Sequence, residues 1–180
     1  MSIIFTYYFN SIPFMKKNNR IISPIASFNY HLENYNGLIK DFRKNNDVSY
    51  IGSMLKDCYT SELTNKIYQF DYDALVLTDV SQNIIWVNDG FKNMTGYTKK
   101  FAIGKKPSFL QGEKTSAIVK KQLRENLAFN HTYSGSIINY RRSGELYLCQ
   151  ITILPIYNLD EKLKYYVAIE KDETKMNRSD

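Results

Sequence analysis

The stretch that decides the fold is Asn83–Thr98, N-I-I-W-V-N-D-G-F-K-N-M-T-G-Y-T. Its first part, Ile84–Val87, is a run of β-branched and aromatic residues, which favours a short strand. Asn88 or Asp89 then stands where a side-chain oxygen can accept hydrogen bonds from the first amides of a helix. Gly96 suits the left-handed conformation that ends a helix. The stretch therefore predicts a strand followed at once by a short helix.

The segments around this stretch predict further strands and a longer helix. One strand is expected before it, and an amphipathic helix and a three-stranded meander are expected after it, with Gly144 in the first turn of the meander. The expected bounds are Ala74–Thr78 for the first strand, 114–130 for the helix, and 133–141, 146–157 and 163–170 for the meander. This order predicts an α+β domain, a five-stranded antiparallel sheet with short helices on one face.

Residues 30–72 predict a helical extension ahead of this domain. Apolar residues recur at steps of three and four, which places them on one face of a helix. They are Leu32, Tyr35, Leu38, Ile39 and Phe42, and then Val48, Ile51, Met54, Leu55 and Tyr59. The N-N-D run between the two sets predicts a break, and Ser61 is expected to cap a third helix. Because the meander carries apolar residues on both faces, its outer face needs a cover, either this extension or a dimer partner.

Composition excludes several classes of protein. The 180 residues, 43% of them hydrophobic, suffice for one core and an extension. The net charge of +6 comes from scattered Lys and Arg, so direct nucleic-acid binding is not expected. The apolar start lacks a preceding basic segment and is too short to span a bilayer, so we expect a cytoplasmic protein with no membrane segment. Residues 1–29 are assigned as disordered or an uncertain start, at Met1 or Met15, and residues 175–180 as a flexible tail.

The chemistry-bearing residues form no catalytic or metal motif. Cys58 and Cys149 have neither zinc-site spacing nor a disulfide pattern and are expected to be free thiols. His31 and His131 stand apart from any H-E-x-x-H motif. No nucleophile elbow or phosphate-binding loop is present, so we expect the protein not to be an enzyme.

Four motifs in order now resemble the PAS domain, and most closely its light-oxygen-voltage (LOV) branch. They are Asp79 with N-I-I-W-V-N-D-G-F, then M-T-G-Y-T, then F-L-Q-G, then N-Y-R-R-S-G-E. The resemblance covers residues 73–174. It implies a sensing and protein-interaction module, often with a small molecule held between sheet and short helices. With no effector segment in the sequence, it also implies a stand-alone bacterial PAS protein.

The loop Gly104–Gly112, G-K-K-P-S-F-L-Q-G, departs from the LOV pattern. In that branch it supplies a cysteine that bonds to a flavin, and Pro107 stands there instead. Proline has no nucleophile, so covalent flavin photochemistry is not expected. The resemblance also implies that polar flavin contacts are replaced at Lys106, Ser108, Cys149 and Glu170, whereas Gln111 and Asn139 persist.

These positions define the candidate pocket lining: Lys106, Gln111, Asn139, Cys149 and Glu170. By strand alternation, Cys149 shares the inner face with Asn139 and is expected to act as a small buried hydrophobe. Two arrangements remain open. In one, Lys106 and Glu170 meet or together hold a small zwitterionic ligand. In the other, aromatic and leucine side chains fill the cavity (Tyr147, Tyr166, Phe109 and Leu110), and both charges reach water.

Two functions also remain open. The first is a non-catalytic sensor that binds a small ligand or an effector protein. The second is a ligand-free interaction module that forms homodimers through its sheet or its N-terminal helices. A non-photochemical flavin or haem sensor is a further alternative, although the histidine that PAS haem domains usually carry on the longer helix is absent and His131 lies just past its end.

Overall fold

The computed structural model describes residues 24–58 and 60–174, with side chains from Asn29 onward. These residues fall into two units divided after Asp41, and each unit is taken by itself. The helical elements are α2 (Pro24–Leu55), η1 (Lys56–Cys58), α3 (Ser61–Gln69), α4 (Asp89–Thr95), α5 (Lys99–Ala102), η2 (Pro107–Leu110) and α6 (Ala117–Ala128). The strands are β1 (Ala74–Asp79), β2 (Ile84–Val87), β3 (Tyr133–Tyr140), β4 (Leu146–Tyr157) and β5 (Leu163–Asp172).

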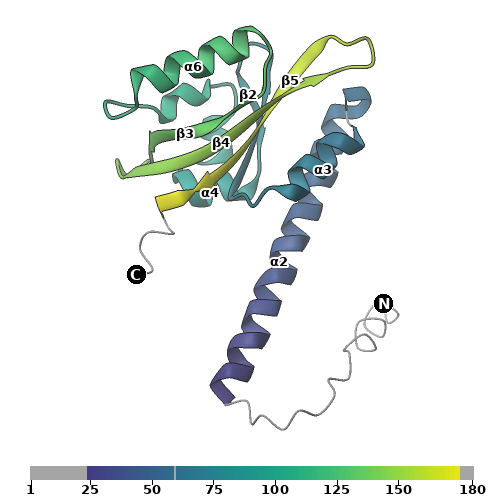
Figure 1. The fold of residues 1–180 in the computed structure, drawn as a ribbon, viewed down its shortest axis with the longest axis vertical. Helices are drawn as coiled ribbons and strands as arrows, with labels where there is room; N and C mark the ends of the chain where they lie inside the picture. The colour runs from purple at the N-terminus through teal and green to yellow at the C-terminus, as the bar shows by residue number, and fades with distance from the viewer. Residues whose placement is uncertain (1–23, 59, 175–180) are drawn as a thin grey trace. The chain divides into compact units, whose positions relative to one another are not determined.

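The five strands form one antiparallel sheet in the order β2-β1-β5-β4-β3 (Figure 1). The predicted bounds of β2 and β4 are confirmed, and Gly144 has the positive φ that the hairpin turn needs (87°). Strand β5 runs to Asp172, beyond its predicted end, because that residue still pairs with Cys149 of β4. The expected α+β fold is confirmed.

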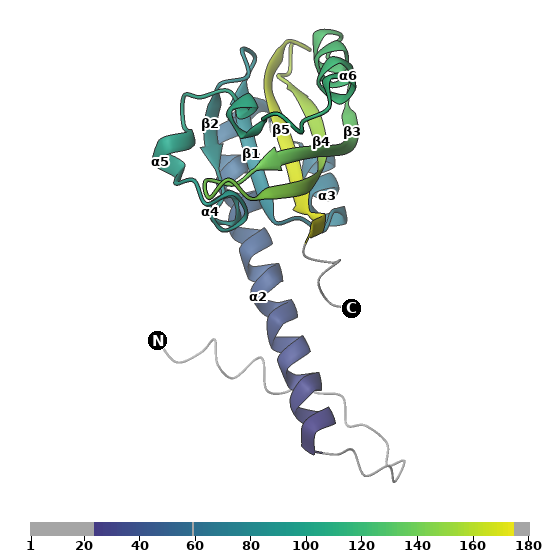
Figure 2. The same cartoon turned by 90° about the vertical axis from the view of Figure 1, so that its left-hand side faces the viewer.

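The inner face of the sheet carries the short helices. Figure 2 shows α4, α5 and α6 on one face of the strands and α3 on the other. The inner core joins side chains of all five strands to Phe91 and Met94 of α4, Leu110 of η2 and Leu127 of α6. Helix α6 is shorter than predicted, and Ile118 in its first turn is 71% exposed. The helix packs against the inner core through Val119, Leu123 and Leu127.

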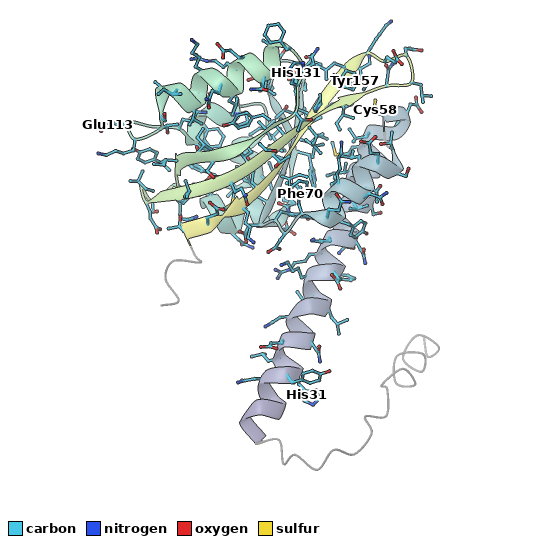
Figure 3. The ribbon with its side chains drawn as sticks, viewed as in Figure 1. His31, Cys58, Phe70, Glu113, His131 and Tyr157 are labelled. Carbon is cyan, nitrogen blue, oxygen red and sulfur yellow. The ribbon has the colours of Figure 1, made fainter. Side chains whose placement is uncertain are left out.

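The outer face of the sheet is covered by the helical extension. From Phe42 onward, α2, η1 and α3 contribute Val48, Ile51, Leu55, Cys58, Leu63 and Ile67 to a core with outward residues of β1, β2, β4 and β5. In Figure 3, Cys58 and Phe70 mark the two ends of α3 on this face. Leu75 and Leu77 of β1 are fully buried here, and burial of each such side chain contributes about 2 kcal/mol. The expected cover by the extension is confirmed for this unit.

The break predicted at N-N-D is wrong, because α2 continues through it. These residues make tertiary contacts that offset their weak helix propensity. Asn45 accepts a hydrogen bond from the Tyr68 hydroxyl, and the Lys44 ammonium donates to the carbonyl of Phe70 at 2.6 Å. The helix also begins at Pro24, ahead of the predicted start of the extension. The rest of residues 1–29, and the predicted tail at 175–180, lie outside the described residues.

Asn88 joins three elements of the fold. Its Oδ1 accepts from the amide of Phe91 (3.1 Å), which caps α4 as predicted, and from the amide of Leu75 in β1 (3.0 Å). Its Nδ2 donates to the carboxylate of Asp47 on α2 (2.8 Å), which also accepts from the Tyr72 hydroxyl. Desolvation raises the pKa of Asp47 despite these two hydrogen bonds. The cap of α3, predicted at Ser61, is Thr60.

Replacing Asn88 with alanine is expected to destabilise the fold by about 2–4 kcal/mol, because the buried amides of Leu75 and Phe91 both lose their acceptor. Urea unfolding measures this loss. Ser116→Ala is the matched control, since Ser116 caps α6 at an exposed site through one long bond to Val119 (3.4 Å). Equal losses in the two variants would contradict the joining role of Asn88.

Candidate functional site: a cavity between the sheet and helix α6

A cavity of about 350 Å³ lies between the inner face of the sheet and the segments η2 and α6. This volume falls in the range of small-molecule sites. Its sheet side is formed by Thr78, Ile137, Asn139, Ile151, Ile153, Tyr166, Ala168 and Glu170, and its other side by Leu110, Leu123 and Leu127. Partly or fully exposed side chains complete it: Gln82, Lys106, Pro107, Ser108, Gln111, Lys120 and Arg124. The walls are apolar, and polar groups lie at a few defined places.

The structure places Lys106, Gln111, Asn139 and Glu170 in the lining of this cavity. Cys149, the fifth candidate, does not line it. Its side chain is fully buried in the inner core, on the sheet face that alternation predicted. Burial, and next the charge of Glu170, raise the pKa of the Cys149 thiol well above its ordinary value. Cys149 is therefore a neutral core residue and not a reactive thiol.

Glu170 is the most unusual residue of the lining. It is 2% exposed, and its Oε2 has no hydrogen-bond partner among the described residues. Burial raises the pKa of Glu170 from 4.5 to about 7. Tyr147 and Cys149 of β4 interact with it electrostatically but bring no positive charge. An ionised carboxylate at this position is consequently uncompensated.

The nearby guanidinium of Arg141 is engaged elsewhere. It pairs with the buried Asp172 carboxylate at 2.7 Å, contacts Glu145, and lies over the ring of Tyr147 at 4.6 Å. It also donates to the carbonyl of Met94, which ties the β3–β4 hairpin to α4. Asp172 thus has the strong partner that Glu170 lacks.

Two further buried polar atoms lack partners among the described residues. These are Asn139 Oδ1, on the cavity wall, and the hydroxyl of its cross-strand neighbour Tyr147. The two side chains lie close together, and Asn139 partly offsets the rise that burial causes in the pKa of Tyr147, although neither atom makes a hydrogen bond of good geometry. A buried acceptor without a donor costs about 1–3 kcal/mol. Together with Glu170, Asn139 leaves two unmatched acceptors on an inner wall that is otherwise formed mainly by apolar side chains and the hydroxyl-bearing residues Thr78 and Tyr166.

Sequence reasoning missed the basic residues Lys120 and Arg124, which were not among the predicted lining residues. Both line the cavity together with Leu123 and Leu127. These four positions follow the i, i+3, i+4, i+7 spacing of one helix face, which is the signal that could have identified them. With Lys106, they place three cationic side chains around the more exposed part of the cavity.

The expectation that aromatic residues fill the cavity is only partly met. Tyr147 is buried in the core, and Tyr166 holds α6 against β5, its hydroxyl 3.1 Å from the carbonyl of Leu127 and 3.0 Å from Asn130 Oδ1. A volume nevertheless remains open. Lys106 reaches water as expected, whereas Glu170 does not. His131, at the end of α6 (Figure 3), is exposed and stacks on Phe129, so it does not line the cavity.

Glu170 is expected to make stability depend on pH. Its folded-state pKa lies above its unfolded value, so the free energy of unfolding falls as pH rises from about 4.5 to about 7 and stays lower above that range. The difference between the two pKa values corresponds to roughly 3 kcal/mol. Glu170→Gln removes this loss. In urea unfolding it is expected to gain on the wild type at pH 8 and much less at pH 4.5. A gain that is equal at both pH values would show that Glu170 does not titrate this way.

Comparison with known proteins places this geometry in a family. The "Blue-light photoreceptor" of Listeria innocua serovar 6a is 40% identical over 104 residues, 56% of this chain and 41% of that protein. The "Nitrogen fixation regulatory protein" of Klebsiella oxytoca is 33% identical over 99 residues, 55% of this chain and 20% of that protein. This chain therefore spans less than half the length of either relative.

Comparison with solved structures also finds LOV domains. The LOV domain from the Erythrobacter litoralis EL346 blue-light activated histidine kinase has a TM-score of 0.54 at 33% identity, over 58% of this chain and 97% of that domain. The LOV domain of Aureochrome1, at 23% identity and a TM-score of 0.56, shares the fold. Among the described residues, none of the helices is both long and apolar enough to span a lipid bilayer. Residues 73–175 match the PAS domain family, and the chain belongs to it.

Proposed function

We propose that this protein is a cytoplasmic, non-catalytic sensor that binds a small molecule in the cavity and passes its binding state to a protein partner. The observation that carries this proposal is the pair of buried, unmatched polar atoms, Glu170 Oε2 and Asn139 Oδ1, on the wall of an open apolar cavity. Native proteins seldom leave such atoms unpaired unless a bound group satisfies them. A domain that served only as an interaction module would gain stability by filling the cavity and replacing both residues.

A flavin that reacts covalently does not fit this cavity. Pro107 lines the cavity and offers no thiol, while Cys149 is outside the lining and holds its proton. The polar side chains that contact flavin in the LOV branch are also replaced, since Glu170 and Lys106 bring ionisable groups to the cavity. The ligand proposed here is therefore bound by non-covalent contacts alone.

The outer face of the sheet supports an output through α2. Thr78 and Glu170 line the cavity, while the outward residues of the same two strands, among them Leu77 and Ile169, pack in the core that α2 and α3 complete. Asn88 adds a polar connection from β1 and α4 to Asp47 of α2. A ligand that shifts β1 or β5 thereby alters the packing of α2.

The cavity proposal is tested with a variant that fills the space. Ala168→Leu adds side-chain volume to the cavity wall, whereas Gln150→Leu introduces the same residue at an exposed position of the neighbouring strand β4. Native mass spectrometry of freshly purified protein is expected to show an added small-molecule mass, lost on mild activation, in the wild type and in Gln150→Leu. Ala168→Leu is expected to lack it. Retention of the same mass in Ala168→Leu would place the ligand elsewhere.

A second candidate function, homodimerisation, is favoured by one observation on α2. Large apolar side chains stand out from this helix, with exposures between 46% and 65%: Tyr30, Leu32, Tyr35, Leu38 and Phe42. A self-associating helix presents such a stripe to its copy. The sheet route to a dimer is less favoured, because α2 and α3 already cover much of the outer face.

Light scattering on eluted protein tests this second function. The wild type is expected to have twice the chain mass of 21.1 kDa, and Leu38→Glu is expected to have the single mass. Asn29→Glu adds the same charge to the same helix on the side away from the stripe, and is expected to leave the dimer intact. A wild type that is monomeric at high micromolar concentration would rule out this function.

A further inference from the structure

The inner wall of the cavity is short of hydrogen-bond donors. The two unmatched atoms that line it, Glu170 Oε2 and Asn139 Oδ1, are both acceptors. Rotation of the Asn139 amide can exchange its acceptor for a donor, but an ionised Glu170 can only accept. Among the described residues, Glu170 takes part in no salt bridge, and the guanidinium of Arg141, which lies over the ring of Tyr147, is bound to Asp172. A complementary ligand therefore brings N–H donors, and preferably a positive charge, to this wall.

The exposed part of the cavity has the opposite character. Lys106, Lys120 and Arg124 line it, and within the part of the chain that the structure describes, Glu170 is the single carboxylate of the lining. The ion pair seen on α6, between Glu125 and Lys121, involves none of these three side chains. The apolar side chains of Leu110, Leu123, Leu127 and Ile137 also line the cavity. The cavity thus combines buried acceptors and apolar walls with basic side chains that lie at its more exposed part, its mouth.

We propose that the cavity selects a small zwitterion, with an amine or amidine group against Glu170 and Asn139, an apolar body, and a carboxylate or phosphate at the Lys106–Lys120–Arg124 mouth. This inference rests on the proposed function and names its ligand class. In this proposal Glu170 determines which ligands bind, because a cation beside its buried carboxylate forms a charge-assisted pair with little competition from water.

Ligands without a cation are disfavoured by the same geometry. A neutral group that presents an acceptor to Glu170 requires the carboxyl to keep its proton, and a neutral donor leaves the ionised form without a counter-charge. The other groups that face Glu170 do not change this. Tyr147 and Cys149 on β4 stay neutral through burial, and Asp172 on β5 is negative and paired with Arg141. The positive charge has to come from the ligand.

Three matched probes separate the two ends of the proposed ligand. 4-Amidinobenzoate has both charges on an apolar ring, benzamidine lacks the anion, and 4-methylbenzoate lacks the cation. Titration calorimetry on ligand-stripped full-length protein at pH 8 is expected to give a Kd of about 1 mM or tighter for 4-amidinobenzoate. Both single-charge probes are expected to bind at least about tenfold more weakly.

The variants assign the effect to the buried carboxylate. Glu170→Gln keeps the shape and the acceptor oxygen but removes the charge, and is expected to weaken 4-amidinobenzoate at least about tenfold while leaving 4-methylbenzoate unchanged. Glu113→Gln removes a carboxylate from an exposed site outside the lining (Figure 3) and is expected to match the wild type. Glu170→Gln is not expected to impair folding, since it relieves a buried charge.

The outcomes distinguish this inference from the proposed function. Binding of 4-methylbenzoate as tight as that of 4-amidinobenzoate, or equal affinity in Glu170→Gln, would overturn the zwitterion while the cavity still bound a small molecule. Failure of all three probes, with the added mass still lost in Ala168→Leu, would also overturn the zwitterion and leave the sensor intact. Failure of the probes together with no added mass in the wild type would overturn both.

Discussion

The fold depends on a single sheet whose central strands, β1 and β5, are largely buried on both faces. All of β1 except its last residue is buried, with Ala74, Val76 and Thr78 facing the inner core or the cavity and Leu75 and Leu77 facing the helices. A strand buried on both sides cannot shift its register without exposing one apolar set and crowding the other. This constraint makes the sheet a wall shared by the cavity and the helical cover. A change on the cavity side therefore reaches α2 and α3 without a separate relay.

Asn88 shows how polar groups are accommodated at that wall. Its amide satisfies two buried backbone donors and still has a donor to spare, which goes to Asp47. Asp47 sits partly buried, with Tyr72 as its second donor, so the helix is held by directional bonds as well as by packing. Hydrogen bonds fix the position of α2 along the sheet more closely than apolar contacts do, because the hydrophobic effect is non-directional and apolar contacts tolerate small displacements. The hydrogen bonds of Asn88 and Asp47 would suit the proposed sensor, whose output depends on the position of α2 on the sheet.

Sequence patterns predicted the sheet well because the signals there are local. Strand β2, the cap at Asn88, the left-handed Gly96 and the hairpin at Gly144 each follow from the chemistry of one or two residues. The errors arise where tertiary contacts override propensity. Asn45 and Asp47 predict a helix break from their weak helix propensity. In the structure they stay helical because they hydrogen-bond to Tyr68, Tyr72 and Asn88. Four of the five candidate lining residues were predicted from family motifs. Lys120 and Arg124 share a helix face with Leu123 and Leu127, but that spacing alone does not say which face of α6 borders the cavity.

Glu170 is the point at which stability and binding oppose each other. Its strand partners are apolar or small, and its carboxyl is shut away from water with one oxygen unmatched, so the empty domain carries a cost that glutamine would largely avoid. Arg141 could have offset that cost, but the fold directs it to Asp172 and to the end of α4. The charge is thus left available to whatever enters the cavity. Folding has already removed water from the Glu170 carboxylate. A cationic ligand would pair with this carboxylate without having to desolvate it again, and its binding would be stronger for that reason. Stabilisation on binding, and with it a signal through β5, follows from the same unpaired carboxylate.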